Sequence, residues 1–144
     1  FLVGVFTLSG AFQKHGIAES VGSAIYSLGM GSVFLITTII IWISVVLSAV
    51  IDNVPYIATM IPVIRVLSAT SSMDPIILLW SLLLGTTLGG NLTYIGASAN
   101  VTAVRLLEKR GYNVSFQKFI RIGIVYNTVA IVIAWILFEL IYAL

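Results

Sequence analysis

A polar, glycine-rich stretch from Gly89 to Asn100 interrupts a long apolar part of the chain, and it limits the folds that the sequence can adopt. Inside a bilayer no water satisfies loose backbone N–H and C=O groups, so a helix break survives there only where protein buries it or where it lines a cavity. A second break, Asp52 to Pro55, carries a carboxylate and follows an apolar run of its own. Two interrupted hydrophobic segments in one chain are typical of the substrate and ion site of a secondary transporter.

The composition places both breaks in a membrane protein. The chain of 144 residues is 60% hydrophobic and 8% charged, whereas soluble domains carry about 25% charged residues. It contains no Cys, which excludes a disulfide, a thiolate metal site and a cysteine nucleophile. Its basic residues are not interleaved with exposed aromatic residues, so nucleic acid is not expected as a partner. Because the sequence opens at Phe1 within an apolar run, we interpret it as a fragment of a longer protein.

Hydropathy predicts one all-α integral membrane domain over residues 1–144. The arm at 56–69 is short against the ~20 residues of a full span, and Pro62 and Arg65 shorten its apolar part further. We therefore favour a re-entrant hairpin with its tip at 52–55 over two full crossings, and we expect a turn over 68–75. The predicted segments are the end of a transmembrane helix (1–12), an interfacial helix (13–31), the re-entrant helical hairpin (33–69), a broken transmembrane helix (75–108) and a continuous transmembrane helix (120–144).

The basic residues predict the orientation in the plasma (inner) membrane. One short loop, 105–121, is flanked by Arg105, Lys109, Arg110, Lys118 and Arg121 and opposed only by Glu108. Short loops rich in Lys and Arg stay in the cytoplasm. We therefore expect this loop to be cytoplasmic and the C-terminus to lie outside, with Lys14 as the one exception to the rule. Arg65 and Glu139 are expected at the outer interface.

Asp52 is the sharpest candidate for a functional group. A carboxylate at membrane depth costs about 2.5 to 3.5 kcal/mol on insertion scales, so its presence there is a functional hypothesis by default. Desolvation favours its protonated form and a nearby cation favours its ionised form, so it is suited to exchange a proton for a cation. The alternative is that Asp52 caps a helix that starts near Pro55, with the proline in the first helical position.

Neutral polar residues supply further oxygen atoms and amides at the two breaks. Oxygen ligands suit hard cations, and unwound carbonyl groups can complete a sodium shell. The alternative role for each amide is helix capping or hydrogen bonding between helices. The backbone freedom of Gly89, Gly90 and Gly96 permits the break, although Gly85 and Gly89 also match a small-xxx-small packing pattern. The binding candidates are Asp52, Asn53, Asn91, Thr93, Ser98 and Asn100, with Na+ as a candidate ligand of Asn53, Asn91, Thr93 and Ser98.

Two stretches, 49–62 and 88–101, resemble the ion transporter superfamily. The similarity is to the C-terminal half of the branch with a citrate transporter-like domain that holds bacterial arsenite permeases, the melanosomal P protein and D-type sodium/proton antiporters. More distant relatives, the divalent anion/sodium symporters and citrate carriers, have Ser-Asn-Thr at the hairpin tip. Here Asp52, Asn53 and Val54 stand at that place, and this departure puts dicarboxylate transport in doubt.

The resemblance implies two inverted repeats, each with a re-entrant hairpin and a broken helix, that meet at a midplane site. This chain matches one repeat and would supply half of the site through the six binding candidates, while a missing N-terminal repeat supplies the rest. The implied function is ion-coupled transport of the arsenite permease type, with a small arsenite- or antimonite-like solute moved with H+ or Na+. Sodium/proton exchange and anion/sodium symport are the alternatives. No bound cofactor is expected beyond the coupling ion, and membrane lipid and a second copy of the chain are candidate partners.

Two other classes of function fit the residues less well. An intramembrane aspartyl protease needs paired carboxylates, and Asp52 has no acidic partner at similar depth. A serine-type site needs a base, and the lone His15 lies outside the predicted spans. A non-transporting assembly subunit would have no need for helix breaks at depth. We therefore expect a transporter and no enzymatic activity.

Overall fold

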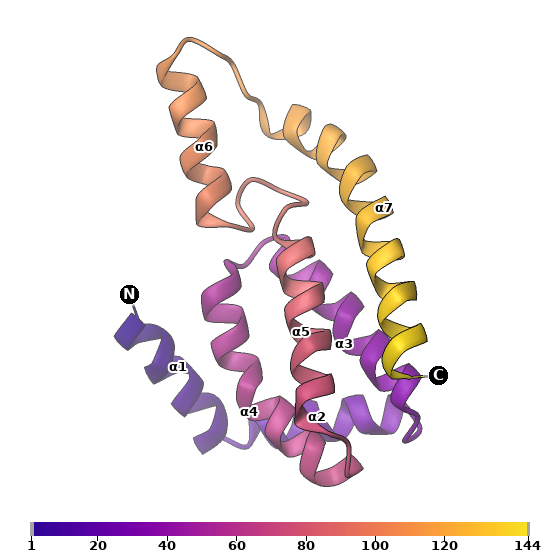
Figure 1. Cartoon of the computed structure of the whole chain (residues 1–144). Helices are drawn as coiled ribbons and strands as arrows, with labels where there is room; N and C mark the ends of the chain where they lie inside the picture. Colours follow the sequence, from indigo (N-terminus) through magenta and orange to yellow (C-terminus); the bar gives the residue numbers. More distant parts are fainter. Residues whose placement is uncertain (1, 144) are drawn as a thin grey trace.

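The chain is all-helical in the computed structural model, which describes residues 2–143 (Figure 1). No strand occurs within that range, so the all-α prediction is confirmed. The seven described helices are α1 Leu2–Lys14, α2 Ile17–Leu28, α3 Val33–Ser48, α4 Asn53–Ser71, α5 Pro75–Gly89, α6 Ser98–Lys109 and α7 Phe116–Tyr142.

The close packing of α3 against α5 forms the centre of the fold. Gly85 and Gly89 both face α3: a Cβ at Gly85 would lie 2.7 Å from the Cβ of Ser44, and one at Gly89 would lie 2.5 Å from the Cα of Val45. Small residues four apart let two helix backbones approach this closely. Both glycines therefore have the packing role that the small-xxx-small pattern predicts. For Gly89, this packing explains why glycine is needed, and no role in ligand binding has to be assumed.

Helices α3 and α4 form a helical hairpin, and both of its arms pack on α5. Each arm packs on α5 more than on the other arm, and near the tip the hydroxyls of Ser44 and Tyr56 lie 3.1 Å apart in a hydrogen bond between the arms. In Figure 1 the tip between α3 and α4 lies about halfway along α7. This position is the one that a re-entrant hairpin requires if α7 spans the membrane.

The second arm of the hairpin is longer than the sequence indicates. Helix α4 has 19 residues and, with the 27-residue α7, is long and apolar enough to cross a membrane, whereas α3 and α5 are shorter. The expected turn at 68–75 shrinks to 72–74 because α4 continues to Ser71. The Ser71 hydroxyl donates to Leu67 O at 2.7 Å within the helix. The argument from a short second arm therefore fails, and the re-entrant hairpin stays a prediction.

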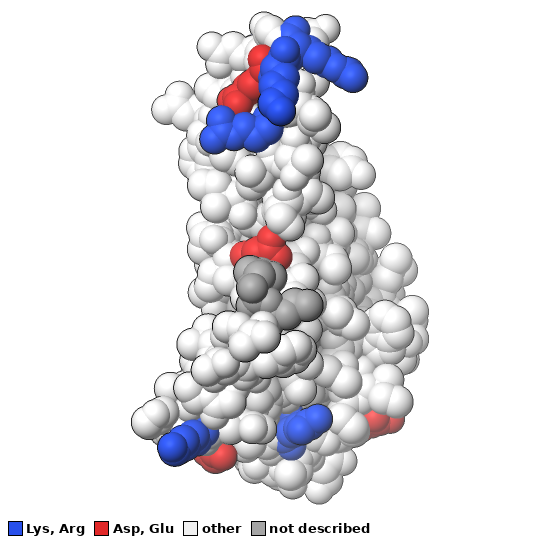
Figure 2. All heavy atoms as spheres, turned by 90° about the vertical axis from the view of Figure 1, so that its left-hand side faces the viewer, with Lys and Arg blue, Asp and Glu red and all other residues white. Residues whose placement is uncertain are grey.

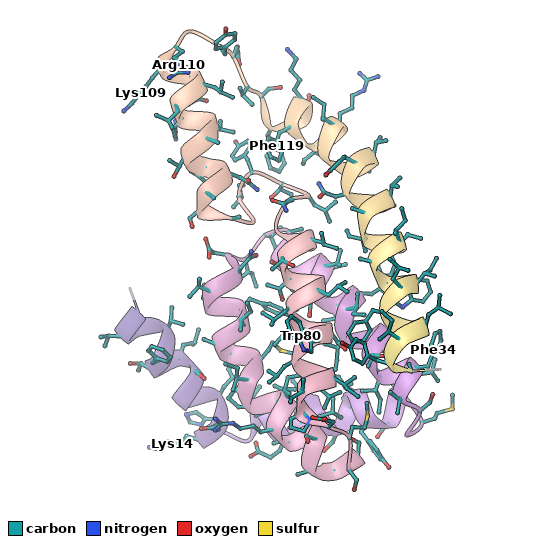
Figure 3. The ribbon with its side chains drawn as sticks, in the orientation of Figure 1. Lys14, Phe34, Trp80, Lys109, Arg110 and Phe119 are labelled. Carbon is teal, nitrogen blue, oxygen red and sulfur yellow. The ribbon has the colours of Figure 1, made fainter. Side chains whose placement is uncertain are left out.

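Helix α2 crosses the ends of the hairpin arms, as the lower part of Figure 1 shows. It buries Ala18, Gly22 and Ile25 on one face and packs on α4. Figure 3 places Lys14 at this end of the molecule and Lys109 and Arg110 at the other. On the face in Figure 2, Lys and Arg gather at the two ends and leave the middle free. Basic residues at both ends and a middle without them are the form expected of a membrane protein, and the acidic atoms in the middle of this face are an exception to the apolar middle.

Glu139 does not lie at an interface, contrary to the sequence-based expectation. It is 3% exposed, and its carboxyl oxygens lie 2.9 Å from the hydroxyls of Thr37 and Thr38 of α3. The sequence pattern misled because Glu139 lies close to the end of α7, where an acid commonly reaches the headgroup region. Arg65 is exposed, as expected.

The contact between α3 and α5 can be tested with Gly85→Leu. Core overpacking costs about 1–3 kcal/mol, and here the added atoms meet backbone that has little room to move. We expect a clearly lower unfolding temperature of the detergent-solubilised whole protein. Gly10→Leu is the matched control, because no atom lies within 4 Å of a Cβ at helical Gly10. Equal unfolding temperatures for the two variants would contradict the packing described here.

Candidate functional site

Four helix ends meet at the level of the hairpin tip: the C-terminal ends of α3 and α5 and the N-terminal ends of α4 and α6 (Figure 1). Helix C-terminal ends present carbonyl oxygens and a partial negative charge, while N-terminal ends present N–H groups and a partial positive charge. Residues 90–97 connect α5 to α6 without helical structure. The break is therefore a place where both kinds of backbone dipole are available to polar groups.

The Asp52 carboxylate joins the N-terminal ends of α4 and α6. One oxygen, Oδ1, accepts the N–H of Val54 at 3.2 Å and so caps α4. The other oxygen, Oδ2, accepts the N–H of Ser98, the first residue of α6, at 2.9 Å. The capping role foreseen for Asp52 is thus present, with the helix beginning at Asn53 and Pro55 in its first turn. A single carboxylate holds together two helix ends that are 46 residues apart in sequence.

The Asp52 carboxylate is hydrogen-bonded by backbone N–H groups, and it forms no ion pair with a basic side chain of the described residues. The ion pair found among the described residues joins Arg105 and Glu108 at 3.1 Å, at the far end of α6. Asp52 itself is half-buried. The two hydrogen bonds found for the Asp52 carboxylate are both donated by backbone N–H groups.

Asn53 ties the tip of the hairpin to α3 and α5. Its Oδ1 accepts the hydroxyl of Ser48 at 2.6 Å, and the same hydroxyl lies 2.9 Å from the carbonyl oxygen of Thr86 on α5. A Cβ on Gly90 would lie 2.5 Å from Asn53 Oδ1. Gly90 is therefore needed so that the end of α5 can approach this amide.

Thr93 and Gly96 hold the break against the end of α3. The Thr93 hydroxyl donates to Ala49 O and accepts the N–H groups of Ile95 at 3.2 Å and Gly96 at 3.1 Å. A Cβ on Gly96 would meet three carbonyl oxygens, of Ser48 at 2.5 Å, Gly90 at 2.8 Å and Ala49 at 2.9 Å. Carbonyl oxygens gathered in this way are the ligand type that hard cations prefer.

Asparagine side chains link the break to α6 and α7. The amide of Asn100 lies within hydrogen-bond distance of Gly90 O at 3.2 Å and Asn91 Oδ1 at 3.3 Å. The Asn91 amide donates to Thr87 O at 3.1 Å. Asn127 of α7, which is 4% exposed, donates to Asn91 O at 3.0 Å. Sequence reasoning missed Asn127, although an amide in the middle of an apolar span is a recognisable signal.

The structure therefore brings all six binding candidates to one level, in different settings. Thr93 is buried; Asp52, Asn53 and Asn100 are half-buried; and Asn91 and Ser98 are exposed. Ser98 contributes its backbone N–H to Asp52.

A groove of about 720 Å³ reaches the break from the α6–α7 loop. Its lining includes Asn91, Tyr112, Asn113, Lys118, Tyr126 and Asn127. Asp52 lies outside this groove.

The role of Thr93 can be tested with Thr93→Val, which keeps the shape and removes the hydroxyl. Two N–H groups then lose their acceptor, at about 1–3 kcal/mol for each unsatisfied buried group. We expect faster amide hydrogen exchange in the peptide that covers residues 90–97, measured by mass spectrometry. Thr102→Val is the control, because its hydroxyl bonds only to Ser98 O of its own helix at 2.9 Å. Unchanged exchange in Thr93→Val would show that another group holds the break.

Comparison with known proteins identifies the relatives of this chain. The family described as "Citrate transporter" matches residues 1–144. An uncharacterized transporter of Mycobacterium tuberculosis CDC 1551 is 38% identical over 136 residues, covering 93% of this chain and 32% of its own length. The "46 kDa membrane protein" of Mycobacterium leprae is 37% identical over 140 residues, covering 94% of this chain and 32% of its own. Mouse P protein is 47% identical over 87 residues, which are 59% of this chain and 10% of that protein.

The chain spans about a third of the length of these mycobacterial relatives and a tenth of P protein. No solved structure matches it significantly. The resemblance drawn from residues 49–62 and 88–101 is confirmed, because P protein and membrane transporters are among the relatives. The expectation of a transporter and not an enzyme is confirmed by the same relatives. The chain therefore belongs to the citrate transporter family of membrane transporters.

Proposed function

We propose that this chain forms half of the site of an ion-coupled secondary transporter of the arsenite permease type, which moves a small inorganic solute with H+ or Na+. The observation that carries the proposal is the Asp52 carboxylate between the N-terminal ends of α4 and α6. The other half of the site is assigned to an N-terminal repeat of opposite orientation.

The same geometry argues against citrate and other carboxylates as substrates of this protein. Helix N-terminal ends are natural sites for anions. Here the protein's own carboxylate already accepts the N–H groups of Val54 and Ser98. A substrate carboxylate would have to displace Asp52 or lie beside a like charge, and both are unfavourable. Anion/sodium symport is therefore the weakest alternative within transport.

A cation or an uncharged solute fits this site better. Arsenite at neutral pH is an uncharged, polyol-like molecule that hydroxyl, amide and backbone groups can hold without thiols. A proton or Na+ would bind at Asp52, with the carbonyl ends of α3 and α5 close by. Within the described residues no group of three or more His, Cys, Asp or Glu side chains lies together.

The hydrogen bonds refine the set of cation ligands. The Thr93 hydroxyl donates once and accepts twice, so its capacity is filled. Asn53 Oδ1 already accepts the Ser48 hydroxyl, and Asn91 Oδ1 lies near the Asn100 amide. We therefore assign direct contact with the cation to Asp52 and neighbouring backbone carbonyls, and keep Asn53 Oδ1 and Asn91 Oδ1, each of which has a second lone pair, as further candidate ligands. Thr93 would position these groups, and the Ser98 hydroxyl would face the solute.

Two alternative functions would use the same residues: one would transport a different cargo, and the other would transport nothing. Sodium/proton exchange would use Asp52 for each ion in turn, and the carbonyl-rich ends of α3 and α5 favour it as the second candidate. A non-transporting assembly subunit has no use for the break at 90–97.

We place the 105–121 loop in the cytoplasm because five basic residues gather there: Arg105, Lys109, Arg110, Lys118 and Arg121. The exposed apolar side chains of α7 would face lipid or the other repeat.

The proposal can be tested with Asp52→Asn in the whole protein, reconstituted in proteoliposomes under a proton or sodium gradient. Asparagine still caps α4 but cannot exchange a proton for a cation. We expect gradient-driven movement of arsenite, or of Na+ in the exchange alternative, to fall about tenfold or more, which equals about 1.4 kcal/mol in the barrier.

Asp74→Asn is the matched control for this measurement. Asp74 caps α5 in the same way, accepting from Ile76 N at 2.8 Å, but it is exposed at the other end of that helix. We expect this variant to transport like the wild type. If Asp52→Asn also does so, Asp52 has no part in coupling. Citrate uptake that depends on Asp52 would overturn the argument about substrate class.

A further inference from the structure

We propose that Glu139 is a second proton-binding site of this protein, and that its proton fastens α7 to the first arm of the hairpin. This site is separate from Asp52. The two acids lie toward opposite ends of α3, since Glu139 contacts Thr37 and Asp52 follows the end of that helix. At 1.5 Å per residue, the stretch of α3 between Thr37 and Ser48 separates them by about 16 Å.

Glu139 is enclosed by α3 and by aromatic side chains of α7. Both of its oxygens lie 2.9 Å from the Thr37 hydroxyl, and Oε1 lies 2.9 Å from the Thr38 hydroxyl. Trp135 Nε1 donates to Thr38 Oγ1 at 2.9 Å, and the Trp135 ring packs on Phe34, with centroids 6.3 Å apart. Figure 3 shows Phe34 beside the C-terminal part of α7. The carboxyl group is therefore shielded from water on the side of α3.

The elements packed against this part of α7 bring no charge to Glu139. Helices α3 and α5 contain no Lys, Arg, His, Asp, Glu or Tyr. On α7 the other charged residues are Lys118 and Arg121, at the opposite end of the helix, and Tyr142 packs on Phe138 with centroids 4.9 Å apart. Asp74, which caps α5, is exposed. A buried carboxylate without a cationic partner is costly, and such groups take up a proton instead.

Counting the hydroxyl hydrogens also favours the protonated acid. Trp135 donates to Thr38, and Thr38 then donates to Glu139 Oε1. Thr37 has one hydroxyl hydrogen and lies 2.8 Å from Val33 O as well as 2.9 Å from Glu139. If Glu139 carries a proton, it donates to Thr37, and Thr37 donates to Val33 O. The protonated acid thus supplies the hydrogen for its contact with Thr37 while Thr37 keeps its bond to Val33 O. In the ionised state the single Thr37 hydrogen serves only one of these two oxygens.

Proton loss would therefore favour a state in which Glu139 leaves α3 and reaches water. A ligand that binds one state better shifts the population toward it, and here that ligand is the proton. Helix α7 is joined to the break through Asn127 and Asn91 and to the hairpin through Glu139 and Thr37. The proton on Glu139 thus controls one of the polar attachments between α7 and α3, beside the bond from Trp135 to Thr38.

Infrared spectroscopy of the whole protein in liposomes tests the proton directly. At neutral pH we expect the C=O stretching band of a protonated carboxylic acid in the wild type and its loss in Glu139→Gln, which keeps the shape and both hydrogen bonds. Glu19→Gln, at an exposed position on α2, is the matched control and should keep the band. Asp52→Asn should keep it too, so this test stands even if the transport proposal fails. A wild-type spectrum without the band, or a Glu139→Gln spectrum in which the band has the same intensity as in the wild type, would overturn the assignment.

Hydrogen exchange tests the fastening of α7 to α3. After correction for intrinsic rates, alkaline pH should speed exchange in the peptide that covers residues 33–38 of the wild type. Glu139→Gln, which cannot ionise, should show no such increase. An equal increase in both proteins would show that the proton on Glu139 does not hold the two helices together.

Discussion

Helix ends within a bilayer must satisfy their backbone groups with protein, because no water is available to do so. Four helix ends meet at the hairpin tip of this domain. The Asp52 carboxylate accepts N–H groups of α4 and α6. The Thr93 hydroxyl accepts two N–H groups of the break and donates to the carbonyl oxygen of Ala49. The Asn100 amide donates to the carbonyl oxygen of Gly90. The polar residues that make the break stable are the same ones that make it a candidate binding site.

This double role has a consequence for substrate class. A carboxylate that fills two helix N-terminal ends makes the tip a poor site for a second anion and a good one for a cation or a neutral solute. The family is described as a citrate transporter family, and the Mycobacterium tuberculosis relative is named as a transporter. We propose that the cargo depends on the residues at the tip, where this chain has Asp52 and Asn53.

The sequence predicted the helices and the two breaks well, because apolar runs and glycine-rich interruptions are local signals. The break at 90–97 lies within the stretch singled out from its glycines, and α7 begins at Phe116, close to the predicted 120. Contacts between distant residues could not be read in this way. The bond from Ser98 to Asp52 spans 46 residues, and the burial of Glu139 depends on how α7 lies on α3. A single polar residue in an apolar helix has the same appearance in sequence whether it faces a partner helix or a headgroup.

The depth of the hairpin tip in the membrane is the most direct test of this account. Spin labels at exposed Val54 and Ser98 in the reconstituted whole protein would report depth through their collisions with oxygen and with a water-soluble nickel complex. Labels at exposed Asp74 and Tyr112 would mark the two surfaces. The account predicts that the labels at Val54 and Ser98 share one depth near the middle of the bilayer. A label at either position that lies as close to water as those at Asp74 and Tyr112 would contradict it.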